Sequence, residues 1–333
     1  MKMEKKKSKK LMEQAQMLLK ERGQKAFEIA KNVILQESSI CGQVYEALRY
    51  FMEESWYDVQ HPALLSLACE AVGGNPEKTT NIGAAIVLLA GAADIHDDIV
   101  DKSKIKNSKL TVFGKFSKDI ALLAGDALLF RGLTLLHETC EKLPKKQRQI
   151  ILNLIKQAFF EMGSAEAKEI GFKGKYNLAP REYRNIIKTK AAVAGASARI
   201  GAILGEGNSK EIDTLGHYGR TLGVLMTIRD DFIDIFEPNE LKNRAKNECL
   251  PLPILYAFQN AEKKNEIARL LKKNKVTKQE TQTVVELVMS TKEVQSLKEE
   301  MKSLIKTEIT RLDSIEGSKA NLILMLKSTL EDL

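Results

Sequence analysis

Cysteine is scarce and scattered in this chain of 333 residues. The four cysteines stand at positions 41, 69, 140 and 249, too far apart for any CxxC spacing. This distribution excludes a disulfide framework and a cysteine-based zinc site, and it is typical of proteins that fold in a reducing compartment. We therefore expect a cytoplasmic protein.

Proline, glycine and aromatic residues are also few. The chain has seven prolines and 20 glycines, and aromatic residues make up 6% of it. Runs of strand-forming residues between turn signals are rare, whereas Ala, Leu, Ile, Glu and Lys dominate, which favours helices. Since 44% of the residues are hydrophobic, the chain can bury a sizeable core, and wholesale disorder is excluded.

No uninterrupted apolar run is long enough to span a bilayer. The longest, at Ile82–Ala93, is ended by Asp94 and is shorter than the roughly 20 residues that a transmembrane helix needs. The basic start of the chain leads into an amphipathic segment instead of the apolar centre of a signal peptide, so we expect no secretion signal.

The excess of positive charge is local. Residues 1–10 contain six lysines and one glutamate, and they supply most of the formal net charge of +8. We interpret them as a basic, flexible tail that could be weakly attracted to a membrane surface. The chain has no zinc-knuckle spacing and no arginine-rich face, so we expect no nucleic-acid partner.

Helical periodicity covers almost all of the remaining chain. No low-complexity linker divides it, so residues 11–333 are predicted to form a single all-α domain, one large helical bundle. The Ile82–Ala93 run is apolar on every side and is predicted to be a buried central helix. The predicted helices span residues 11–35, 41–56, 61–73, 78–103, 117–138, 145–171, 181–205, 210–236, 251–259, 262–272, 278–289, 291–310 and 318–330.

Two copies of one acidic pattern hold six of the 13 aspartates. Each copy reads DDxxD on a predicted helix, so its first and last aspartates share a helix face one turn apart. Like charges at this spacing repel each other, and a hard divalent cation such as Mg2+ relieves the repulsion. The first motif comprises Asp97, Asp98 and Asp101, and the second comprises Asp230, Asp231 and Asp234.

Each acidic motif also closes a strongly apolar helix. A solvated acidic face would explain one such motif, but it explains two of them poorly. Two acidic helices that face each other in an all-α bundle indicate a polyphosphate bridged by Mg2+. The apolar helices behind them indicate that the organic part of this ligand is hydrophobic, and an allylic prenyl diphosphate meets both demands.

At these motifs the chain resembles the all-trans isoprenyl diphosphate synthases, the polyprenyl synthetase family, over roughly residues 40–260. Two further segments support the resemblance. Leu122–Leu129 (LLAGDALL) is similar to the family's AxLaGDxLL helix, and Ile186–Ala202 is similar to its lysine-bearing helix. The resemblance implies the isoprenoid synthase fold, an all-α bundle around a deep central cavity, and a homodimer.

The resemblance also assigns roles to individual residues. It implies that Mg2+ is bound directly by Asp97, Asp101 and Asp230, with Asp98, Asp231 and Asp234 in support. It implies that the allylic diphosphate is held by Lys106, Lys190 and Lys242. His96, beside the first motif, is interpreted as a residue that orients the aspartates.

The residues that bind isopentenyl diphosphate, the second substrate of the family, differ in this chain. Aligned on the shared proline, the lysine and the last arginine of the family motif GGKRxRP become Asp58 and His61. A family histidine becomes Ala90, and the second arginine of the family's RRG becomes Asn107, while its first is still a cation, Lys106. An aspartate in place of a lysine repels a phosphate.

This asymmetry favours an enzyme that ionises a long allylic diphosphate without passing the cation to isopentenyl diphosphate. The cation would react with its own alkene, with water or with another acceptor, as in terpene synthases or atypical prenyltransferases. Two alternatives stay open: a chain-elongating synthase that uses isopentenyl diphosphate, and a regulatory subunit of a heteromeric synthase. Because both acidic motifs and Lys190 are kept, the regulatory alternative is the weaker of the two.

Small residues before the first motif predict a deep pocket. In the family, bulky side chains four and five residues before the first aspartate floor the cavity, and these positions are Ala93 and Ala92 here. The alanines would leave the cavity open to Leu89 and to Ile86, roughly 16 Å below Asp97 at 1.5 Å per residue. We therefore expect a substrate of geranylgeranyl length or longer. Close helix packing is the other reason for two alanines here.

Overall fold

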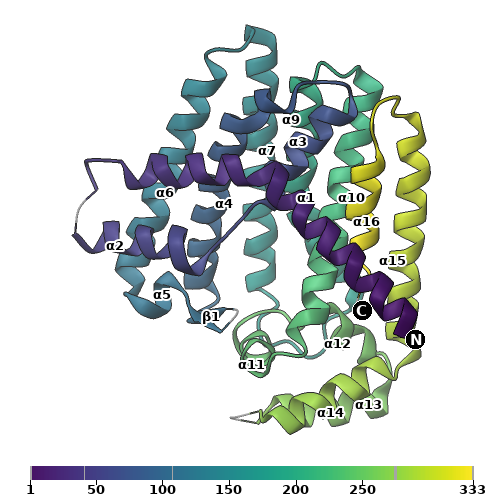
Figure 1. Ribbon diagram of the computed structural model, residues 1–333. Helices are drawn as coiled ribbons and strands as arrows, with labels where there is room; N and C mark the ends of the chain where they lie inside the picture. Colours follow the sequence, from purple (N-terminus) through teal and green to yellow (C-terminus); the bar gives the residue numbers. More distant parts are fainter. Residues whose placement is uncertain (1, 41, 107, 274–275, 332–333) are drawn as a thin grey trace.

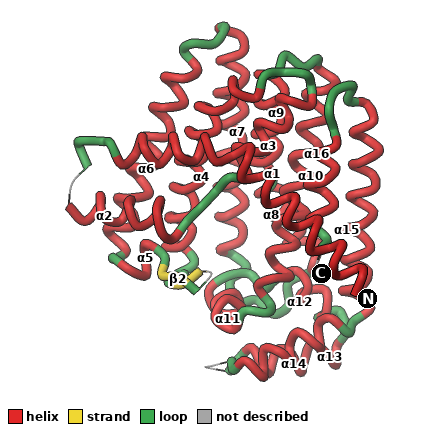
Figure 2. The backbone as a smooth tube through the Cα atoms, in the orientation of Figure 1, coloured by secondary structure: helices red, strands yellow, loops and turns green. Residues whose placement is uncertain are grey.

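The computed structural model describes residues 2–40, 42–106, 108–273 and 276–331, and most of them are helical (Figures 1 and 2). The predicted all-α fold is therefore confirmed. In chain order, the helices are α1 (Lys2–Leu35), α2 (Gly42–Tyr50), η1 (Phe51–Ser55), α3 (Gln60–Ala71), η2 (Pro76–Thr79), α4 (Thr80–Val100), α5 (Val112–Lys115), α6 (Lys118–Cys140), α7 (Lys145–Ile170), α8 (Pro180–Lys190), α9 (Ala192–Leu204), α10 (Ser209–Asp234), α11 (Pro238–Asn247), α12 (Leu252–Ala257), α13 (Ala261–Leu271), α14 (Lys278–Met289), α15 (Lys292–Arg311), η3 (Leu312–Ser314) and α16 (Ala320–Ser328). The strands β1 (Ile105–Lys106) and β2 (Lys109–Leu110) pair in an antiparallel hairpin between α4 and α5.

The centre of the bundle is formed by α3, α4, α9 and α10. α4 packs along α6, while α9 packs between α3 and α10. Glycine permits the close approach of α9 to α3, since a Cβ atom at Gly201 would lie 2.1 Å from the carbonyl oxygen of Leu65. The predicted central run Ile82–Ala93 is buried except at Ala90 and Ala93, which are half-buried.

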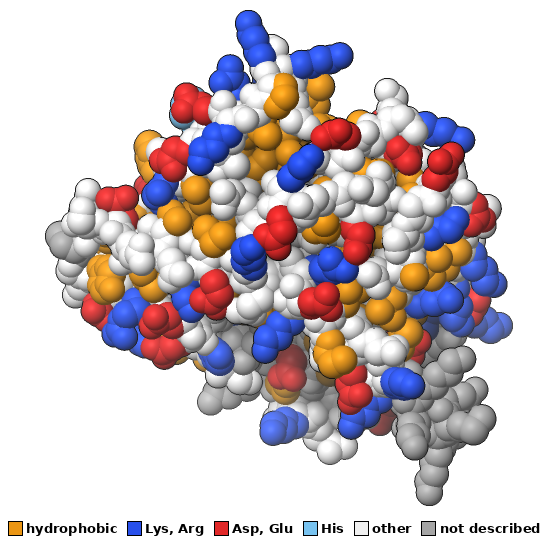
Figure 3. All heavy atoms as spheres, turned by 45° about the horizontal axis from the view of Figure 1, so that its top comes forward, with side chains coloured by type: hydrophobic (Ala, Val, Ile, Leu, Met, Phe, Trp, Pro, Cys, Tyr) orange, Lys and Arg blue, Asp and Glu red, His pale blue; other side chains and the backbone are white. Residues whose placement is uncertain are grey.

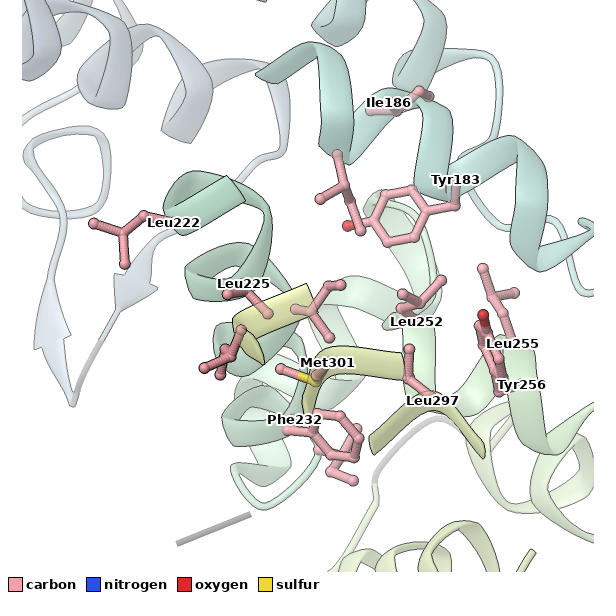
Figure 4. Packing of buried hydrophobic residues seen from close by; sticks show 14 of the residues in the cluster. Tyr183, Ile186, Leu222, Leu225, Phe232, Leu252, Leu255, Tyr256, Leu297 and Met301 are labelled. Carbon is pink, nitrogen blue, oxygen red and sulfur yellow. The ribbon is translucent and has the colours of Figure 1, made fainter. Parts of the chain in front are cut away.

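Two hydrophobic clusters stabilise the two sides of the bundle. One surrounds α1 to α4 and α6, and the other surrounds α10, α12, α15 and α16. In the second cluster, Leu225 and Phe232 of α10 meet Leu297 and Met301 of α15 (Figure 4). α1 runs diagonally across the molecule in Figure 1 and contacts α3, α4 and α16, so it joins the two sides.

Three local features differ from the sequence-based predictions. The predicted helix 181–205 is two helices, because the backbone turns at Ala191 (φ −65°, ψ 0°) without a glycine or proline to announce it. α11 begins at Pro238, between residues 236 and 251 where no helix was predicted, because proline is well tolerated in the first turn of a helix. The first helix begins at Lys2, nine residues before the predicted start at residue 11, since lysines favour helices and no breaker separates these residues from the rest.

By length and hydropathy, α6 is the one helix among the described residues that is long and apolar enough to cross a membrane. The sequence-based prediction missed it because Asp126 interrupts the apolar run. One face of α6 packs in the bundle against α4, and its buried residues include Ala121, Ala124 and Leu128. α6 is therefore a member of the bundle with a second apolar face directed outward.

Candidate active site

The first acidic motif lies at the carboxyl end of α4. Asp97 and Asp98 stand in its last turn, and the N–H of Asp101 donates to the carbonyl oxygen of Asp97 at 2.8 Å, which closes the helix. Asp98 is 3% exposed, whereas Asp97 is half-buried and lines a pocket. The apolar face of α4 thus places this acidic turn at the edge of the hydrophobic core.

Lys106 on the hairpin offsets the charge of this turn. Its Nζ lies 2.8 Å from Oδ1 of Asp98, 3.3 Å from Oδ1 of Asp94 and 3.9 Å from Oδ2 of Asp97. Burial alone would lower the pKa of Lys106, but the three carboxylates raise it well above its ordinary value. The predicted diphosphate-binding residue is therefore a permanent cation beside the first motif.

Lys173 is a second cation at this motif, and the sequence-based prediction missed it. It lies in the turn after α7, and its Nζ donates to Oδ1 of Asp101 at 3.0 Å and to the carbonyl oxygen of Val100 at 2.8 Å. A cation at the carboxyl end of a helix also interacts favourably with the helix dipole. Nothing in its local sequence marks Lys173, because its partners are 72 and 73 residues away.

The second acidic motif lies at the carboxyl end of α10 and is held by Arg244 of α11. Arg244 contacts Oδ1 of Asp231 at 2.7 Å and Oδ2 of Asp234 at 3.2 Å. The backbone N–H of Leu252 donates to Oδ2 of Asp231 at 2.9 Å. Asp230 has no hydrogen bond or ion pair with the described residues and lines a second pocket. The supporting roles predicted for Asp231 and Asp234 fit this arrangement, and Arg244 is a functional candidate that the sequence did not reveal.

Lys190 stands at the end of α8, where the unpredicted turn separates α8 from α9. Its Nζ lies 2.8 Å from Oε1 of Glu166 and 2.5 Å from Oε2 of Glu169 on α7. Burial alone would lower the pKa of Lys190, but the two glutamates raise it. Burial, in turn, raises the pKa of Glu166 to about 7. Lys190 is therefore a cation held in a defined place between α7 and α9.

The carboxylates of the two motifs fit a divalent cation. Burial and neighbouring negative charges raise the pKa of Asp98 and of Asp101 to about 7, and burial raises that of Asp230 to about 6. Hard oxygen ligands with unfavourable mutual repulsion are suited to Mg2+. Within the described part of the chain, no three acidic, histidine or cysteine side chains are already gathered around one point.

The first pocket has a volume of about 270 Å³ and extends from the first motif down between α4, α7 and α9. Its mouth is polar, with Asp97 and Lys190, and its depth is apolar. The α4 residues along it are Ile86, Leu89, Ala90 and Ala93. The structure therefore brings the predicted residues Leu89 and Ala93 to the pocket.

Two predicted residues lie elsewhere. Ala92 is 2% exposed and packs in the core, because successive residues of a helix point ~100° apart and only its neighbour Ala93 can face the pocket. Lys242 points to the end of α13, where its Nζ donates to the carbonyl oxygens of Leu271 at 3.1 Å and of Lys273. The structure does not bring Lys242 to the aspartates, since α11 turns it outward.

His96 contacts an aspartate of α6, not the aspartates of the first motif that it was expected to orient. Its Nε2 lies 3.4 Å from Oδ1 of Asp126, and its ring packs against Gly125 of α6, where a Cβ atom would approach to 2.5 Å. The Gly-Asp pair of the LLAGDALL segment thus makes room for the imidazole and contacts it. The first acidic motif and the LLAGDALL segment therefore meet at this point.

A second pocket of about 200 Å³ lies between α1, α3, α9, α10 and α16. Its walls are apolar and include Leu64, Leu222 and Met325, while Asp230 stands among its few polar residues. The two pockets share three lining residues, which are His61, Lys190 and Val193. The pockets therefore meet between the two acidic motifs.

Asp58 and His61 form a hydrogen-bonded pair at this meeting point. Oδ2 of Asp58 lies 2.7 Å from Nδ1 of His61, and its Oδ1 accepts from the backbone N–H groups of Gln60 (2.8 Å) and His61 (3.3 Å). Burial raises the pKa of Asp58, but His61 and the backbone donors more than offset this and lower it. Burial alone would lower the pKa of His61, but Asp58 more than offsets this and raises it.

Comparisons with known proteins agree with this geometry. Residues 42–288 match the family described as Polyprenyl synthetase. A short chain isoprenyl diphosphate synthase of Methanothermobacter thermautotrophicus is 31% identical over 180 residues, a match that spans 54% of this chain and 54% of that protein. A geranylgeranyl diphosphate synthase of Methanosarcina mazei is 27% identical over 249 residues, 73% of this chain and 75% of that protein.

Among solved structures, a geranylgeranyl pyrophosphate synthetase from Pyrococcus horikoshii superposes with a TM-score of 0.83. It is 24% identical in sequence, and the match covers 98% of this chain and 100% of that one. A heptaprenyl diphosphate synthase from Staphylococcus aureus superposes with a TM-score of 0.77 at 20% identity over 93% of this chain and 97% of that one. The fold is the all-α isoprenoid synthase fold.

Proposed function

The chain belongs to the polyprenyl synthetase family, and we propose from this premise that it is a chain-elongating synthase. It would condense isopentenyl diphosphate with an allylic prenyl diphosphate and release a product of geranylgeranyl length or longer. Relatives named geranylgeranyl diphosphate synthases support this proposal. They favour it over the interpretation, drawn from Asp58, His61 and Asn107, that isopentenyl diphosphate is not used.

One observation carries the proposal: two pockets, each with a residue of one acidic motif at its mouth, meet at the same lysine. Asp97 stands in the first pocket, Asp230 in the second, and Lys190 in both. A reaction between two diphosphates needs two neighbouring sites that place the reacting carbons together. The deeper, apolar first pocket suits the allylic chain, and the second suits the acceptor.

The chain's own residues bind the allylic diphosphate and protect the cation. Lys106, Lys173 and Lys190 supply positive charge around the place where the leaving diphosphate accumulates negative charge. Asp97, Asp101 and Asp230 would hold Mg2+, which neutralises the diphosphate and stabilises it as a leaving group. The apolar walls of the first pocket keep water away from the allylic carbon.

A second candidate function is ionisation without isopentenyl diphosphate, by a terpene synthase-like enzyme or an atypical prenyltransferase. The position that holds a phosphate-binding lysine in the family holds Asp58 here, and its carboxylate is already committed to His61. This pair gives the second site less positive charge than the family's lysine and arginine would give it.

The test is an incubation of the purified protein with Mg2+ and farnesyl or geranylgeranyl diphosphate, with and without labelled isopentenyl diphosphate. We expect label in a longer prenyl diphosphate. Diphosphate released without uptake of label, together with a hydrocarbon or an alcohol, would establish the second candidate instead. No turnover in any tube would indicate a subunit that needs a partner, the third possibility that the sequence leaves open.

We also propose that the protein works in the cytoplasm, because its few scattered cysteines fit a reducing compartment. A weak attraction of its lysine-rich first ten residues to anionic membrane surfaces would bring it close to hydrophobic substrates. Fractionation of the source cells at low and at high salt checks both proposals, since a surface attraction of this kind is lost at high salt.

A further inference from the structure

The hairpin of β1 and β2 has an inner and an outer face, and it lies at an edge of the molecule (Figure 2). Its register pairs Ile105 with Leu110 and Lys106 with Lys109. Successive residues of a strand point to opposite sides of the sheet. Lys106 points inward, since its Nζ lies 2.8 Å from Oδ1 of the buried Asp98. Ile105 and Leu110, the outer pair, therefore share the outer face, where they are 46% and 43% exposed.

The base of the hairpin is anchored to the helices beside it. The hydroxyl of Tyr50 in α2 donates to the carbonyl oxygen of Leu110 at 2.7 Å. The backbone N–H of Thr111 donates to the carbonyl oxygen of Lys104 at 3.0 Å, and its hydroxyl donates to that of Ser103 at 2.7 Å. The outer pair is thus presented to solvent from a fixed base, although apolar side chains gain nothing from exposure to water.

The chain around the outer pair is strongly basic. Residues 102–118 contain six lysines and no acidic residue. Lys104 and Lys115 are exposed, and Nζ of Lys115 lies 3.5 Å from the centroid of the Tyr50 ring, beside the anchor of Leu110. Lysines with long apolar stems around a few apolar side chains complement a surface that is anionic outside and apolar inside.

Two further exposed apolar side chains stand at the same end of the bundle. Val100 ends α4 and is 40% exposed, and Ile170 ends α7 and is 48% exposed. Nζ of Lys173, in the turn after α7, donates to the carbonyl oxygen of Val100 at 2.8 Å, which joins the two helix ends. The apolar and basic groups are therefore concentrated beside the first acidic motif.

We propose that this end of the molecule binds the surface of an anionic lipid bilayer, with the outer pair inserted at the level of the headgroups and the lysines on lipid phosphates. A stable protein interface buries about 800 Å² on each partner, far more than the outer pair offers. A bilayer needs no matching shape, and a few apolar side chains with clustered basic charge are enough to bind it. The absence of acidic residues from 102–118 favours the anionic surface.

The use of such a contact rests on the proposed function. A prenyl diphosphate of geranylgeranyl length or longer partitions its apolar chain into a bilayer and keeps its diphosphate among the headgroups. Lys106 follows Ile105 in the chain, and its Nζ lies 3.9 Å from Oδ2 of Asp97 at the mouth of the first pocket. Insertion of Ile105 therefore holds this mouth next to the lipid that supplies the substrate or receives the product.

The experiment is flotation of the purified full-length protein with vesicles of phosphatidylcholine, alone or mixed with phosphatidylglycerol. We expect the wild type to bind neutral vesicles more than ~30-fold more weakly than anionic ones. Ile105→Ser/Leu110→Ser should lower the partition coefficient for anionic vesicles ~10-fold or more, because the inserted apolar side chains are lost. Lys104→Gln/Lys115→Gln should lower it ~30-fold at low salt and much less at high salt, where these charges are screened.

Two double variants serve as matched controls. Ile150→Ser/Leu304→Ser removes exposed apolar side chains of α7 and α15 and should bind as the wild type does. Lys9→Gln/Lys10→Gln removes two exposed charges of α1 and should weaken binding less than Lys104→Gln/Lys115→Gln does. Thermal unfolding of each variant shows that the fold is kept.

A tryptophan at position 105 reports insertion directly. With anionic vesicles, the emission of Ile105→Trp should move to shorter wavelength and be quenched by brominated lipid, whereas that of Ile150→Trp should not change. Trp56, the single natural tryptophan, gives the same background in both variants.

The proposal is overturned if the wild type does not bind anionic vesicles, if Ile105→Ser/Leu110→Ser binds them as tightly, or if only Lys9→Gln/Lys10→Gln loses binding. A shift of Ile105→Trp with Mg2+ and inorganic diphosphate in the absence of vesicles also overturns it, since the outer pair is then covered by a movement within the protein. Flotation needs no turnover. A protein that binds vesicles through the hairpin but incorporates no isopentenyl label therefore loses the proposed function and keeps this surface.

Discussion

Most charged residues of this site are paired with one another in the absence of a ligand. Lys106 and Lys173 contact the first motif, and Arg244 contacts the second. The two groups differ in accessibility, since Arg244 is 12% exposed and is surrounded by acidic partners, whereas Lys106 is 33% exposed. We infer that the lysines exchange their carboxylate partners for a diphosphate, while Arg244 keeps the second motif in shape.

The metal-free protein should lose stability as pH increases. The pKa of Asp101 is raised from 3.8 to about 7, first by burial and then by the charge of Asp97, so between these pH values the folded protein binds more protons than the unfolded chain. The free energy of unfolding therefore falls across this window, from about pH 4 to about pH 7. Thermal unfolding at pH 5 and pH 8 in the presence of a chelator measures the effect, and Mg2+ with inorganic diphosphate should remove most of it.

Asp97→Asn tests separately how much the acidic motif destabilises the folded protein and how much it contributes to diphosphate release. The substitution removes a charge that raises the pKa of Asp98 and of Asp101, so the chelated variant should unfold at the same or a higher temperature than the chelated wild type at pH 8. Its rate of diphosphate release should fall more than ~100-fold. A variant that melts lower and retains turnover would remove Asp97 from the metal site.

Restoring the family's cations should strengthen the second substrate site. In Asp58→Lys/His61→Arg, two positive side chains replace the hydrogen-bonded pair, and the KM for isopentenyl diphosphate should fall about tenfold, which corresponds to ~1.4 kcal/mol. The same variant shows whether kcat changes as well. Steady-state kinetics with labelled isopentenyl diphosphate measure both constants, and His61→Arg alone is the control. An unchanged KM would show that these positions do not face the acceptor.

At the scale of helices, α4 determines how much room the prenyl chain has. Ala93 lies four residues before Asp97, roughly 6 Å down the helix axis, and it lines the first pocket together with Ala90. A phenylalanine at position 93 would project into the cavity. The prenyl chain could then no longer reach the apolar space below it.

Ala93→Phe should therefore shorten the main product by about one five-carbon unit or more. Ala92→Val is the matched control, because Ala92 points ~100° away from Ala93 into the core, and its substitution changes packing but not the pocket. Chromatography of the dephosphorylated products measures the chain lengths. A product distribution equal to that of the wild type would show that the floor of the cavity lies elsewhere.

The elements show what the sequence could and could not predict. Helices and acidic motifs follow from spacing along the chain, so α4, α10 and the aspartates were predictable. Lys173 and Arg244 were not, since ion pairs between separate elements leave no local pattern. The error at Lys242 has the same origin, because α11 was not foreseen and it turns this side chain toward α13. The Asp58–His61 pair could have been found, since residues three apart at the start of a helix are neighbours.

At the scale of the whole molecule, the outward face of α6 is unusual for a water-soluble surface. Leu122, Leu123, Phe130 and Leu133 are 46%, 51%, 71% and 47% exposed, and we call them the α6 strip. On the face drawn in Figure 3, hydrophobic side chains likewise form patches among the charged ones. Asp126 interrupts this strip, but exposed apolar side chains gathered on one helix face are typical of a surface that binds a partner or a membrane.

A second copy of the chain is the partner that best fits the α6 strip, because two identical helices related by a twofold axis bury the same side chains against each other. We expect the wild type to sediment as a homodimer, and Leu123→Glu/Phe130→Glu to sediment as a folded monomer, since buried carboxylates without partners would oppose association. Leu304→Glu, at an exposed leucine of α15, is the control and should remain dimeric. A membrane would be the alternative cover, because α6 is long and apolar enough to enter one. A monomeric wild type that floats with lipid vesicles, and loses this binding in the double variant, would assign the strip to a membrane and reject the dimer.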